Sequence, residues 1–390
     1  MKILYIAPAS PFPAHFGGAM RCAAVLAALG QCGSVELIVV ADEPGQRARA
    51  WLAARGATLW ATPQRGALPR AARIVRGAAT GRSIPALRLA EGRLGEKLRG
   101  EILARRPDVV VLGDTFLGEA APALRDVTPM LVVDNFNVES VLWKNVASVT
   151  RTPAARALYS LLATNTDALE RRVLPLADRV WTASGEDAAW FSRTLALPRV
   201  DVVPNVLPGR APLAPSTSSE ILLSGFFEYP PNEDAALALI GVSQELARRT
   251  VGHSITLVGR GPTRRMRTAA FATPAVAIAG EVESMEPWLE RCGIFAAPLR
   301  AGSGTKFKLL QAMLAGRALV TTPVGASGLE IEHGRHGLVC EYADFASAVA
   351  QLLRDPALRE RLAAEAHRHV TTRFGQARLD DAVRRSLGVP

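Results

Sequence analysis

Short apolar runs alternate with helix-like segments along the whole chain. Each run has the length of a buried strand, and the segments between the runs repeat apolar positions with helical spacing. Strands that alternate with helices in this way form parallel sheets covered by helices. The pattern therefore predicts an α/β fold. Its strands are expected at Lys2–Ala7, Val35–Val40, Asp108–Leu112, Pro129–Asp134, Asp178–Ala183 and Val200–Pro204, and again at Ile221–Phe226, Ser254–Val258, Val276–Ala279, Ile294–Pro298, Ala318–Thr321 and Leu338–Glu341.

One segment interrupts this alternation. Residues 207–219 are rich in proline, serine and alanine and have no hydrophobic periodicity, as expected of a linker. A chain of 390 residues is also too long for a single ordinary core. We therefore predict two doubly wound, parallel-sheet domains, one over residues 1–206 and one over residues 220–373, joined by the linker 207–219.

The most informative stretch follows the fourth predicted strand of the second domain. Gly302 and Gly304 allow a tight turn and let a ligand approach the backbone closely. Ser303 or Thr305 can then cap the helix that follows, just as Ser184 is placed to cap a helix farther upstream. A helix N-terminus after a glycine loop presents free N–H groups and the positive end of the helix dipole.

Two polar side chains, Lys308 and Gln311, lie one turn apart near the start of this helix. A lysine in the first turn opposes the helix dipole, so we expect an anionic ligand there. The alternative is an ordinary strand–turn–helix crossover with a solvated lysine, because a glycine loop alone is a weak motif. The residues by themselves leave both interpretations open.

The loop and helix resemble the donor-binding signature of the group 1, or GT4-type, glycosyltransferases, and in particular that of bacterial polysaccharide-biosynthesis sugar transferases. The resemblance implies a GT-B fold, in which two Rossmann-like domains flank a cleft. The nucleotide-sugar donor would bind the C-terminal domain and the acceptor the N-terminal one, and a C-terminal helix over about 374–390 would pack back onto the N-terminal domain. The residues that carry the resemblance read Gly302-Ser-Gly-Thr-Lys-Phe-Lys-Leu-Leu-Gln-Ala-Met-Leu-Ala-Gly316.

Two positions depart from the family's pattern. Gln311 stands where the family has a glutamate that usually holds the donor ribose hydroxyls. A glutamine oxygen still accepts a hydrogen bond, but without the strength that a charge adds. Phe136 replaces the histidine of an Asp-x-His-Asn-Val-Glu motif, in which Asp134, Asn137 and Glu139 are retained. A histidine acid or base at this position is therefore not expected.

The resemblance also assigns the remaining candidate site residues. Gly17 and Gly18 resemble the glycine pair in the first loop of GT-B enzymes, and Gly225 and Asn232 resemble the entry to the second domain. Arg260 lies at the end of a predicted strand near the expected anion site. Catalytic roles are implied for Lys308, Asp134 and Asn137, and donor binding for Gly17, Gly18, Gly225, Asn232, Arg260, Gly302, Ser303, Gly304, Thr305, Lys306, Lys308 and Gln311.

The family's reaction is the transfer of a sugar from a nucleotide-diphosphate donor to a glycan or lipid-linked glycan, with retention of anomeric configuration. The resemblance implies no metal and no cofactor, with the nucleotide-diphosphate sugar as co-substrate. Three alternatives remain: another nucleotide-sugar enzyme such as an epimerase, a degenerate homologue that binds a glycan or partner without turnover, and a nucleic-acid-binding protein suggested by charge alone.

The net charge of +10 is compatible with nucleic acid, an anionic membrane surface or a phosphorylated substrate as partner. Part of the excess lies between Arg65 and Arg106, where basic residues outnumber acidic ones. No aromatic residue is interleaved there, which argues against binding of nucleic acid through base stacking. The stretch suits peripheral contact with an anionic membrane, or equally a solvated surface of an arginine-rich protein.

The compartment follows from what the sequence lacks. No apolar run reaches the roughly 20 residues of a membrane-spanning helix. The N-terminus is predicted to be a strand that Pro8 ends, and not a signal peptide. The four cysteines have no CxxC spacing, so neither a zinc site nor a disulfide framework is indicated. We predict a cytoplasmic protein, with the inner face of the cytoplasmic membrane as an alternative location.

Overall fold

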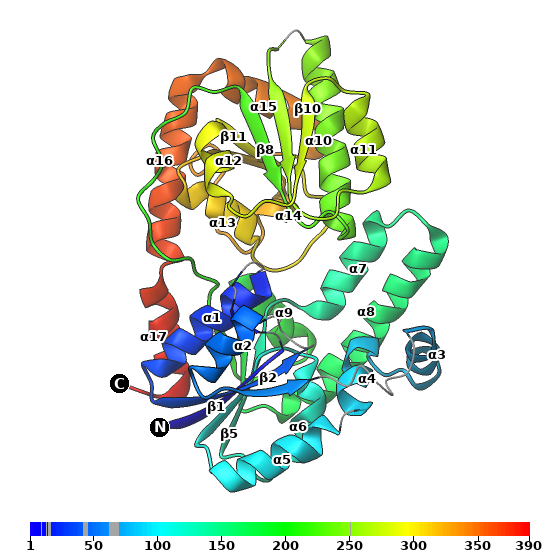
Figure 1. Cartoon of the computed structure of the whole chain (residues 1–390), viewed down its shortest axis with the longest axis vertical. Helices are drawn as coiled ribbons and strands as arrows, with labels where there is room; N and C mark the ends of the chain where they lie inside the picture. Colours follow the sequence, from blue (N-terminus) through cyan, green and yellow to red (C-terminus); the bar gives the residue numbers. More distant parts are fainter. Residues whose placement is uncertain are drawn as a thin grey trace. The chain divides into compact units, whose positions relative to one another are not determined.

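The structure is a computed structural model that describes residues 1–8, 10–12, 14, 17–41, 46–61, 70–91, 93–249 and 251–390. The chain divides into two compact units, each with its own parallel sheet (Figure 1). The first unit comprises Met1–Ala147, Pro153–Val206 and Gln376–Pro390. The second unit comprises Ser148–Thr152 and Leu207–Gly375.

The sheet of the first unit has seven parallel strands in the order β3-β2-β1-β4-β5-β6-β7. This is the doubly wound order of Rossmann-like domains, in which the strand sequence reverses beside the first strand. The reversal lies between β1 and β4. The strands are β1 (Lys2–Ala7), β2 (Ser34–Ala41), β3 (Thr58–Ala61), β4 (Val109–Leu112), β5 (Met130–Asn135), β6 (Arg179–Thr182) and β7 (Val200–Val202).

The sheet of the second unit repeats the same scheme. Its six parallel strands have the order β10-β9-β8-β11-β12-β13, and the reversal lies between β8 and β11. The predicted α/β fold with two Rossmann-like sheets is thus confirmed. The strands are β8 (Glu220–Ser224), β9 (Ser254–Val258), β10 (Val276–Gly280), β11 (Ile294–Ala297), β12 (Ala318–Thr321) and β13 (Leu338–Val339).

Helices connect the strands and cover the sheets. Between β5 and β6, two successive helices are separated before Pro153, because proline starts a helix readily but cannot continue one. The first unit contains α1 (Gly17–Gly30), α2 (Gln46–Ala53), α3 (Arg70–Thr80), α4 (Ile84–Glu91), α5 (Leu94–Arg105), η1 (Leu117–Ala120), α6 (Ala121–Leu124), α7 (Glu139–Val149), α8 (Pro153–Val173), η2 (Leu174–Leu176), α9 (Gly185–Thr194) and α17 (Gln376–Leu387).

In the second unit, residues 207–219 form neither a helix nor a strand and lead directly into β8. Gly316, with a φ of 69°, ends α13, as expected of a glycine after a helix C-terminus. The helices are α10 (Pro230–Arg248), α11 (Arg264–Phe271), α12 (Glu286–Arg291), α13 (Phe307–Leu314), α14 (Pro323–Ala326), η3 (Tyr342–Asp344), α15 (Phe345–Arg354) and α16 (Pro356–Arg373).

Both faces of the first sheet are buried. In β5, Leu131 and Val133 contribute to one apolar cluster and Val132 to the other, because successive strand side chains point to opposite faces. Helix α5 covers the first face, and helices α1 and α17 cover the second. The end of the chain is fixed there by a hydrogen bond of 2.7 Å from Trp181 Nε1 to Ser386 Oγ.

Candidate functional site

The predicted glycine loop lies at the carboxyl ends of the strands in the second sheet. Strand β8 ends at Ser224 and is followed by Gly225, and β11 is followed by the loop that contains Gly302 and Gly304. These two strands are the neighbours between which the strand order reverses. In doubly wound sheets this is the position where ligands bind. The topology therefore brings the two predicted loops to the expected ligand position.

Glycine lets the backbone segments pack closely at this edge. A Cβ atom on Gly225 would lie 3.1 Å from the side chain of Asn232 and 3.2 Å from Lys308 Nζ. Gly259 follows β9 with a φ of 144°, and a Cβ atom there would lie 1.8 Å from the carbonyl oxygen of Gly225. No other residue fits at Gly259 without displacing the backbone. The edge of the sheet is consequently formed by backbone, which a ligand can approach closely.

Lys308 and Asn232 join two helices at this edge. Lys308, in the first turn of α13, donates a hydrogen bond of 2.5 Å from Nζ to Asn232 Oδ1. Asn232, in the first turn of α10, in turn donates from Nδ2 to the carbonyl oxygen of Phe226 at 2.9 Å. The structure thus brings Lys308 next to Gly225 and Asn232, although Lys308 and Asn232 are 76 residues apart in the sequence.

The charge of Lys308 is destabilised in the protein alone. Burial, together with the nearby charge of Lys306, lowers the pKa of Lys308 from 10.5 to about 7. No carboxylate of the described residues pairs with this lysine, whose only polar partner among them is the Asn232 amide. An anion beside Lys308 would favour its charged form and raise this pKa again.

A third cationic side chain, Arg260, follows β9 next to this cluster. Its guanidinium lies 4.8 Å from the centre of the Phe226 ring, and its carbonyl oxygen accepts a hydrogen bond of 2.8 Å from Phe227 N. Within the part of the chain that the structure describes, Arg260 has no carboxylate partner. Lys306 is buried, with Nζ 3.4 Å from the carbonyl oxygen of Ser327. This edge of the sheet therefore carries positive charge.

The loop before α13 has an unusual backbone. Gly302 and Gly304 have φ angles of 149° and 61°, and both values favour glycine. The N-cap of α13 is Lys306, and no side chain caps the helix, so the predicted cap by Ser303 or Thr305 is wrong. The hydroxyl of Thr305 is instead buried and has no hydrogen-bond partner among the described residues. A buried hydroxyl without a partner is costly, and a bound ligand would supply one.

Gln311 lies one helical turn after Lys308 on α13. Its side chain is half-buried, and none of the residues that the structure describes forms a hydrogen bond with its amide. The half-buried Ser303 lies in the loop ahead of the helix. Both residues are thus in the vicinity of the cluster, with side-chain groups that can bind a ligand.

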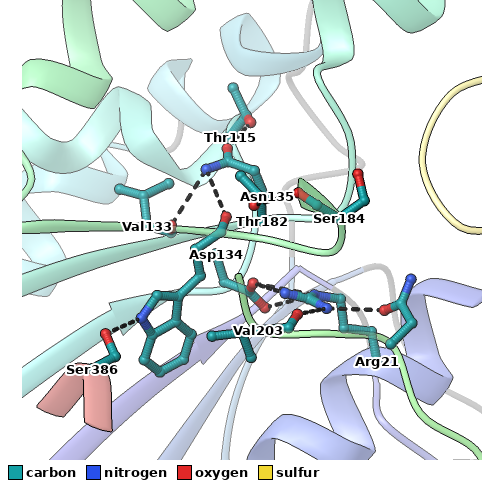
Figure 2. A network of polar contacts seen from close by, with 11 residues as sticks. Arg21, Thr115, Val133, Asp134, Asn135, Thr182, Ser184, Val203 and Ser386 are labelled. Carbon is teal, nitrogen blue, oxygen red and sulfur yellow. Dashed lines mark hydrogen bonds and ion pairs between the residues drawn. The ribbon is translucent and has the colours of Figure 1, made fainter. Parts of the chain in front are cut away.

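Asp134, predicted as catalytic, lies in the core of the first unit and pairs with Arg21 (Figure 2). Arg21 Nε lies 3.1 Å from both carboxylate oxygens, and Nη1 donates at 2.9 Å to the carbonyl oxygen of Val203 and to Asn205 Oδ1. Burial raises the pKa of Asp134, and the charge of Arg21 opposes that rise. The ion pair connects α1 to the ends of β5 and β7, which gives Asp134 a structural role.

Asn137, the other predicted catalytic residue of the first unit, orients a carboxylate that we had not assigned to the site. Its Nδ2 donates to Glu139 Oε1 at 3.0 Å. The pKa of Glu139 is raised to about 8, mainly by burial and also by the charges of Asp114, Glu170 and Asp187, while the hydrogen bond from Asn137 opposes the rise. Glu139 is only half-buried, so a polar ligand can reach it. The retained Asn-Val-Glu motif was the signal in the sequence that could have identified this residue.

Gly17 and Gly18 open helix α1 and belong to the first unit, whereas α13 belongs to the second.

The sequence analysis did not identify one further charged residue at the carboxyl ends of the strands in the second sheet. Asp234, at the start of the second turn of α10, forms an ion pair with Arg300, which follows β11. This ion pair connects helix α10, which follows β8, to the segment that follows β11, beside the cluster around Lys308.

Ion pairs neutralise part of the basic stretch between residues 65 and 106. Arg65 itself lies outside the described residues. No described helix is long and apolar enough to cross a membrane, and the described residues contain no cluster of three or more His, Cys, Asp and Glu side chains suited to a metal ion. Peripheral membrane contact stays a prediction. Among the described residues, the ion pairs of the stretch include Arg82–Glu119, Arg93–Glu96, Arg99–Asp126, Arg105–Glu36 and Arg105–Glu101.

The sequence of residues 218–355 matches the profile of the family described as Glycosyl transferases group 1. This span contains Gly225, Asn232, Arg260, the glycine loop and helix α13. No curated protein matches the chain by sequence. The sequence resemblance is therefore strongest in the unit that carries the positively charged edge.

Solved structures with the same fold extend over the whole chain. Sucrose-phosphate synthase from Thermosynechococcus elongatus has a TM-score of 0.74 at 14% identity and covers 100% of this chain and 99% of that chain. HepE from Anabaena, solved in complex with UDP-glucose, has a TM-score of 0.67 at 16% identity, with coverages of 100% and 99%. A glycosyltransferase from Rickettsia africae ESF-5 has a TM-score of 0.66 at 12% identity, with coverages of 99% and 98%.

Because these sequence identities are low, the structural likeness establishes the fold alone. The sequence match assigns residues 218–355, in the second unit, to the pattern of the group 1 glycosyltransferases. Together they confirm the resemblance that the glycine loop and its helix predicted. The chain has the GT-B glycosyltransferase fold, and its residues 218–355 carry the sequence pattern of the group 1 glycosyltransferases.

Proposed function

We propose that this protein transfers a sugar from a nucleotide-diphosphate donor to a glycan or lipid-linked glycan acceptor. The second unit binds the donor, and the first unit binds the acceptor. The observation that supports this most directly is the edge around Lys308, where three cationic side chains gather beside exposed backbone at the switch point of a doubly wound sheet. A diphosphate is complementary to that edge in charge.

In this proposal the positive edge stabilises the charge that grows on the departing diphosphate. Lys308 provides most of this stabilisation, with Lys306, Arg260 and the N–H groups near the glycine loop in support. Because Lys308 is already removed from water, its attraction for a phosphate oxygen is stronger than that of an exposed lysine. The Gln311 side chain accepts a hydrogen bond from a donor ribose hydroxyl.

The reaction retains the anomeric configuration and uses no metal ion. The departing phosphate oxygen takes the proton of the acceptor hydroxyl, which is consistent with Phe136 at the position where relatives have a histidine. Nuclear magnetic resonance of the first-formed product distinguishes retention from inversion. Turnover that persists in excess EDTA supports metal independence, and turnover that stops and returns with Mg²⁺ or Mn²⁺ contradicts it.

Calorimetric titration of the full chain with UDP-, GDP- and ADP-sugars tests donor binding. Lys308→Ala is expected to weaken binding of the preferred donor by at least about 1.5 kcal/mol, the scale of a hydrogen bond to a charged group. Lys144→Ala, which removes an exposed lysine of the first unit, is the matched control and should leave the affinity unchanged. Equal affinities for the wild type and Lys308→Ala would remove this lysine from the donor site.

A second candidate is a homologue that binds a donor or glycan without turnover. It is favoured by the ion pair that occupies Asp134 and by Phe136, whose ring centre lies 5.8 Å from the guanidinium carbon of Arg21. Donor binding without sugar release, across a panel of glycan and lipid-linked acceptors, would support this candidate. Release of the free nucleotide that depends on an acceptor would exclude it.

A further inference from the structure

A separate cavity lies in the second unit, at the amino ends of the strands and thus at the opposite edge of the sheet from Lys308. Its volume is about 190 Å³. It is bounded by Gly293, directly before β11, by Ala318 at the start of β12, by residues 212–217 of the linker and by the first turns of α16. In Figure 1 the green trace that leads into β8 runs along α16.

Two arginines that are almost completely buried line this cavity. Arg317 follows α13 and is 2% exposed, and Arg359, in the first turn of α16, is 4% exposed. Arg317 Nη2 donates to the carbonyl oxygen of Ala214 at 2.8 Å. Arg359 donates to the carbonyl oxygens of Ser218 and Thr217 at 2.6 and 3.2 Å. These bonds hold the linker but do not neutralise either charge.

Neither guanidinium has a carboxylate partner within the described part of the chain. The Nε atoms of both arginines are buried and have no hydrogen-bond partner there. Burial of a charged group without a counter-charge is among the most costly arrangements in a protein interior, and buried arginines are normally paired. Desolvation by burial lowers the pKa of both arginines, and for Arg317 the more distant charges of Glu290 and Glu286 only partly oppose this.

The cavity has the features of a site for a small phosphorylated ligand. Guanidinium groups bind phosphate oxygens through parallel N–H donors, and two guanidiniums suit the double negative charge of a phosphate monoester. Ser216 and Thr217 also line the cavity and add hydroxyl groups. About 190 Å³ holds a phosphate group with a few further atoms, whereas sites for larger organic ligands span roughly 300–1,000 Å³.

We propose that Arg317 and Arg359 form a binding site for the phosphate group of a small anion, either inorganic phosphate or a short phosphate monoester, separate from the donor site. The ligand accepts hydrogen bonds from the two guanidinium groups and bridges α16, the linker and the segment that follows α13. The exposed carboxylate of Glu360 at the cavity disfavours ligands with a second acidic group at that side. This site is independent of the proposed sugar transfer.

Titration of the full-length Lys308→Ala variant tests this site, because that substitution weakens phosphate binding at the donor site. The probes are inorganic phosphate and glycerol 3-phosphate, with glycerol and chloride at matched ionic strength as controls. We expect saturable binding of one equivalent of phosphate probe and none of glycerol. Tighter binding of glycerol 3-phosphate identifies a phosphate monoester as the ligand, and tighter binding of inorganic phosphate identifies the free ion.

Two substitutions in the same background locate the bound probe. Arg359→Gln removes one guanidinium, and Ala364→Glu adds a negative charge to an exposed position of α16 that lines the cavity. Each should weaken phosphate binding at least tenfold, whereas Arg354→Gln, an exposed arginine of α15, should not change it. If Arg359→Gln does not fold, the effect of Ala364→Glu on phosphate affinity tests the location of the site by itself. Absence of saturable binding, or affinity unaltered by Ala364→Glu, would overturn the proposal.

Discussion

The two units have the same strand order but opposite chemistry at the carboxyl ends of their strands. In the second unit, Lys308, Lys306 and Arg260 gather there beside bare backbone. In the first unit the segments that follow β4 and β5 carry Asp114 and Glu139, and burial raises the pKa values of these carboxyl groups to about 6 and 8. The fold determines where a ligand binds, and the side chains determine which ligand.

This contrast matches the two partners of the proposed reaction. A cationic edge attracts the diphosphate of the donor. Carboxylates with raised pKa values suit the neutral hydroxyl groups of a sugar acceptor, because they can accept or donate hydrogen bonds near neutral pH. If the comparison is correct, the two units should respond differently to changes of charge and of pH.

The largest effect is expected in the first unit, where the ion pair of Arg21 and Asp134 supports the strand ends. Arg21→Met should destabilise the protein by about 3–5 kcal/mol, because it leaves a buried carboxylate without a partner. Urea denaturation followed by circular dichroism measures this loss. Adding Asp134→Asn should restore much of the stability, since it removes the unpaired charge. Equal stability of the single and double variants would show that the pair contributes little.

The next largest effect is expected in the second unit, where donor affinity should depend on pH through Lys308. Lys308 has a pKa of about 7 in the free protein, and a bound diphosphate favours its charged form. Below pH 7 the lysine is already protonated and donor affinity should be constant. Above pH 7 binding must be accompanied by proton uptake, so affinity should fall by up to about tenfold per pH unit, or about 1.4 kcal/mol. Calorimetry between pH 6 and 9 measures both the affinity and the proton uptake.

Lys308→Arg provides the control for this pH dependence. Arginine keeps its charge throughout the range, so the affinity of this variant should not vary with pH above 7. A pH dependence identical to that of the wild type would assign the titration to another group.

The smallest effect concerns Glu139. Its pKa is about 8 in the folded protein against 4.5 in an unfolded chain, so the folded state binds the proton more tightly. The resulting stability is complete below pH 4.5 and is lost as the pH rises through 8. Glu139→Gln stays neutral and keeps an acceptor for Asn137. We expect it to be more stable than the wild type by roughly 1 kcal/mol at pH 9 and equal at pH 5. Thermal denaturation at pH 5 and pH 9 measures the difference in stability between the variant and the wild type. An equal difference in melting temperature at the two pH values would contradict the prediction.

Strands and helix ends were predictable where local chemistry decides them. Strands β1, β9 and β12 have the predicted boundaries, because each is an apolar run of strand length that is buried by its neighbours. Ser184 caps α9 as predicted, with its hydroxyl accepting a hydrogen bond from Asp187 N at 3.1 Å. The same rule failed before α13, where the helix begins only after Lys306 and no side chain caps it, because the positive φ angles of Gly302 and Gly304 shape the loop ahead of the helix.

The candidate site was predictable in part for the same reason. Lys308, Asn232 and Gly225 occur in short motifs, and the strand order then brings these motifs to one edge. The pairing of Asp134 with Arg21 could not be predicted from its own motif, since the partner lies 113 residues away. A single charged residue within the alanine-rich segment of α1 was the available signal. The two buried arginines near the linker gave no signal, because their burial depends on how the linker packs.

Helix α17 has a consequence for how this protein is made. Its Leu379 and Val383 are fully buried against the first sheet, together with side chains of α1 near the beginning of the chain. A nascent chain that has left the ribosome up to Val206 therefore still exposes apolar side chains that residues Gln376–Pro390 cover in the folded unit. During synthesis the second unit can complete its core before the first unit can, although the first unit is translated first.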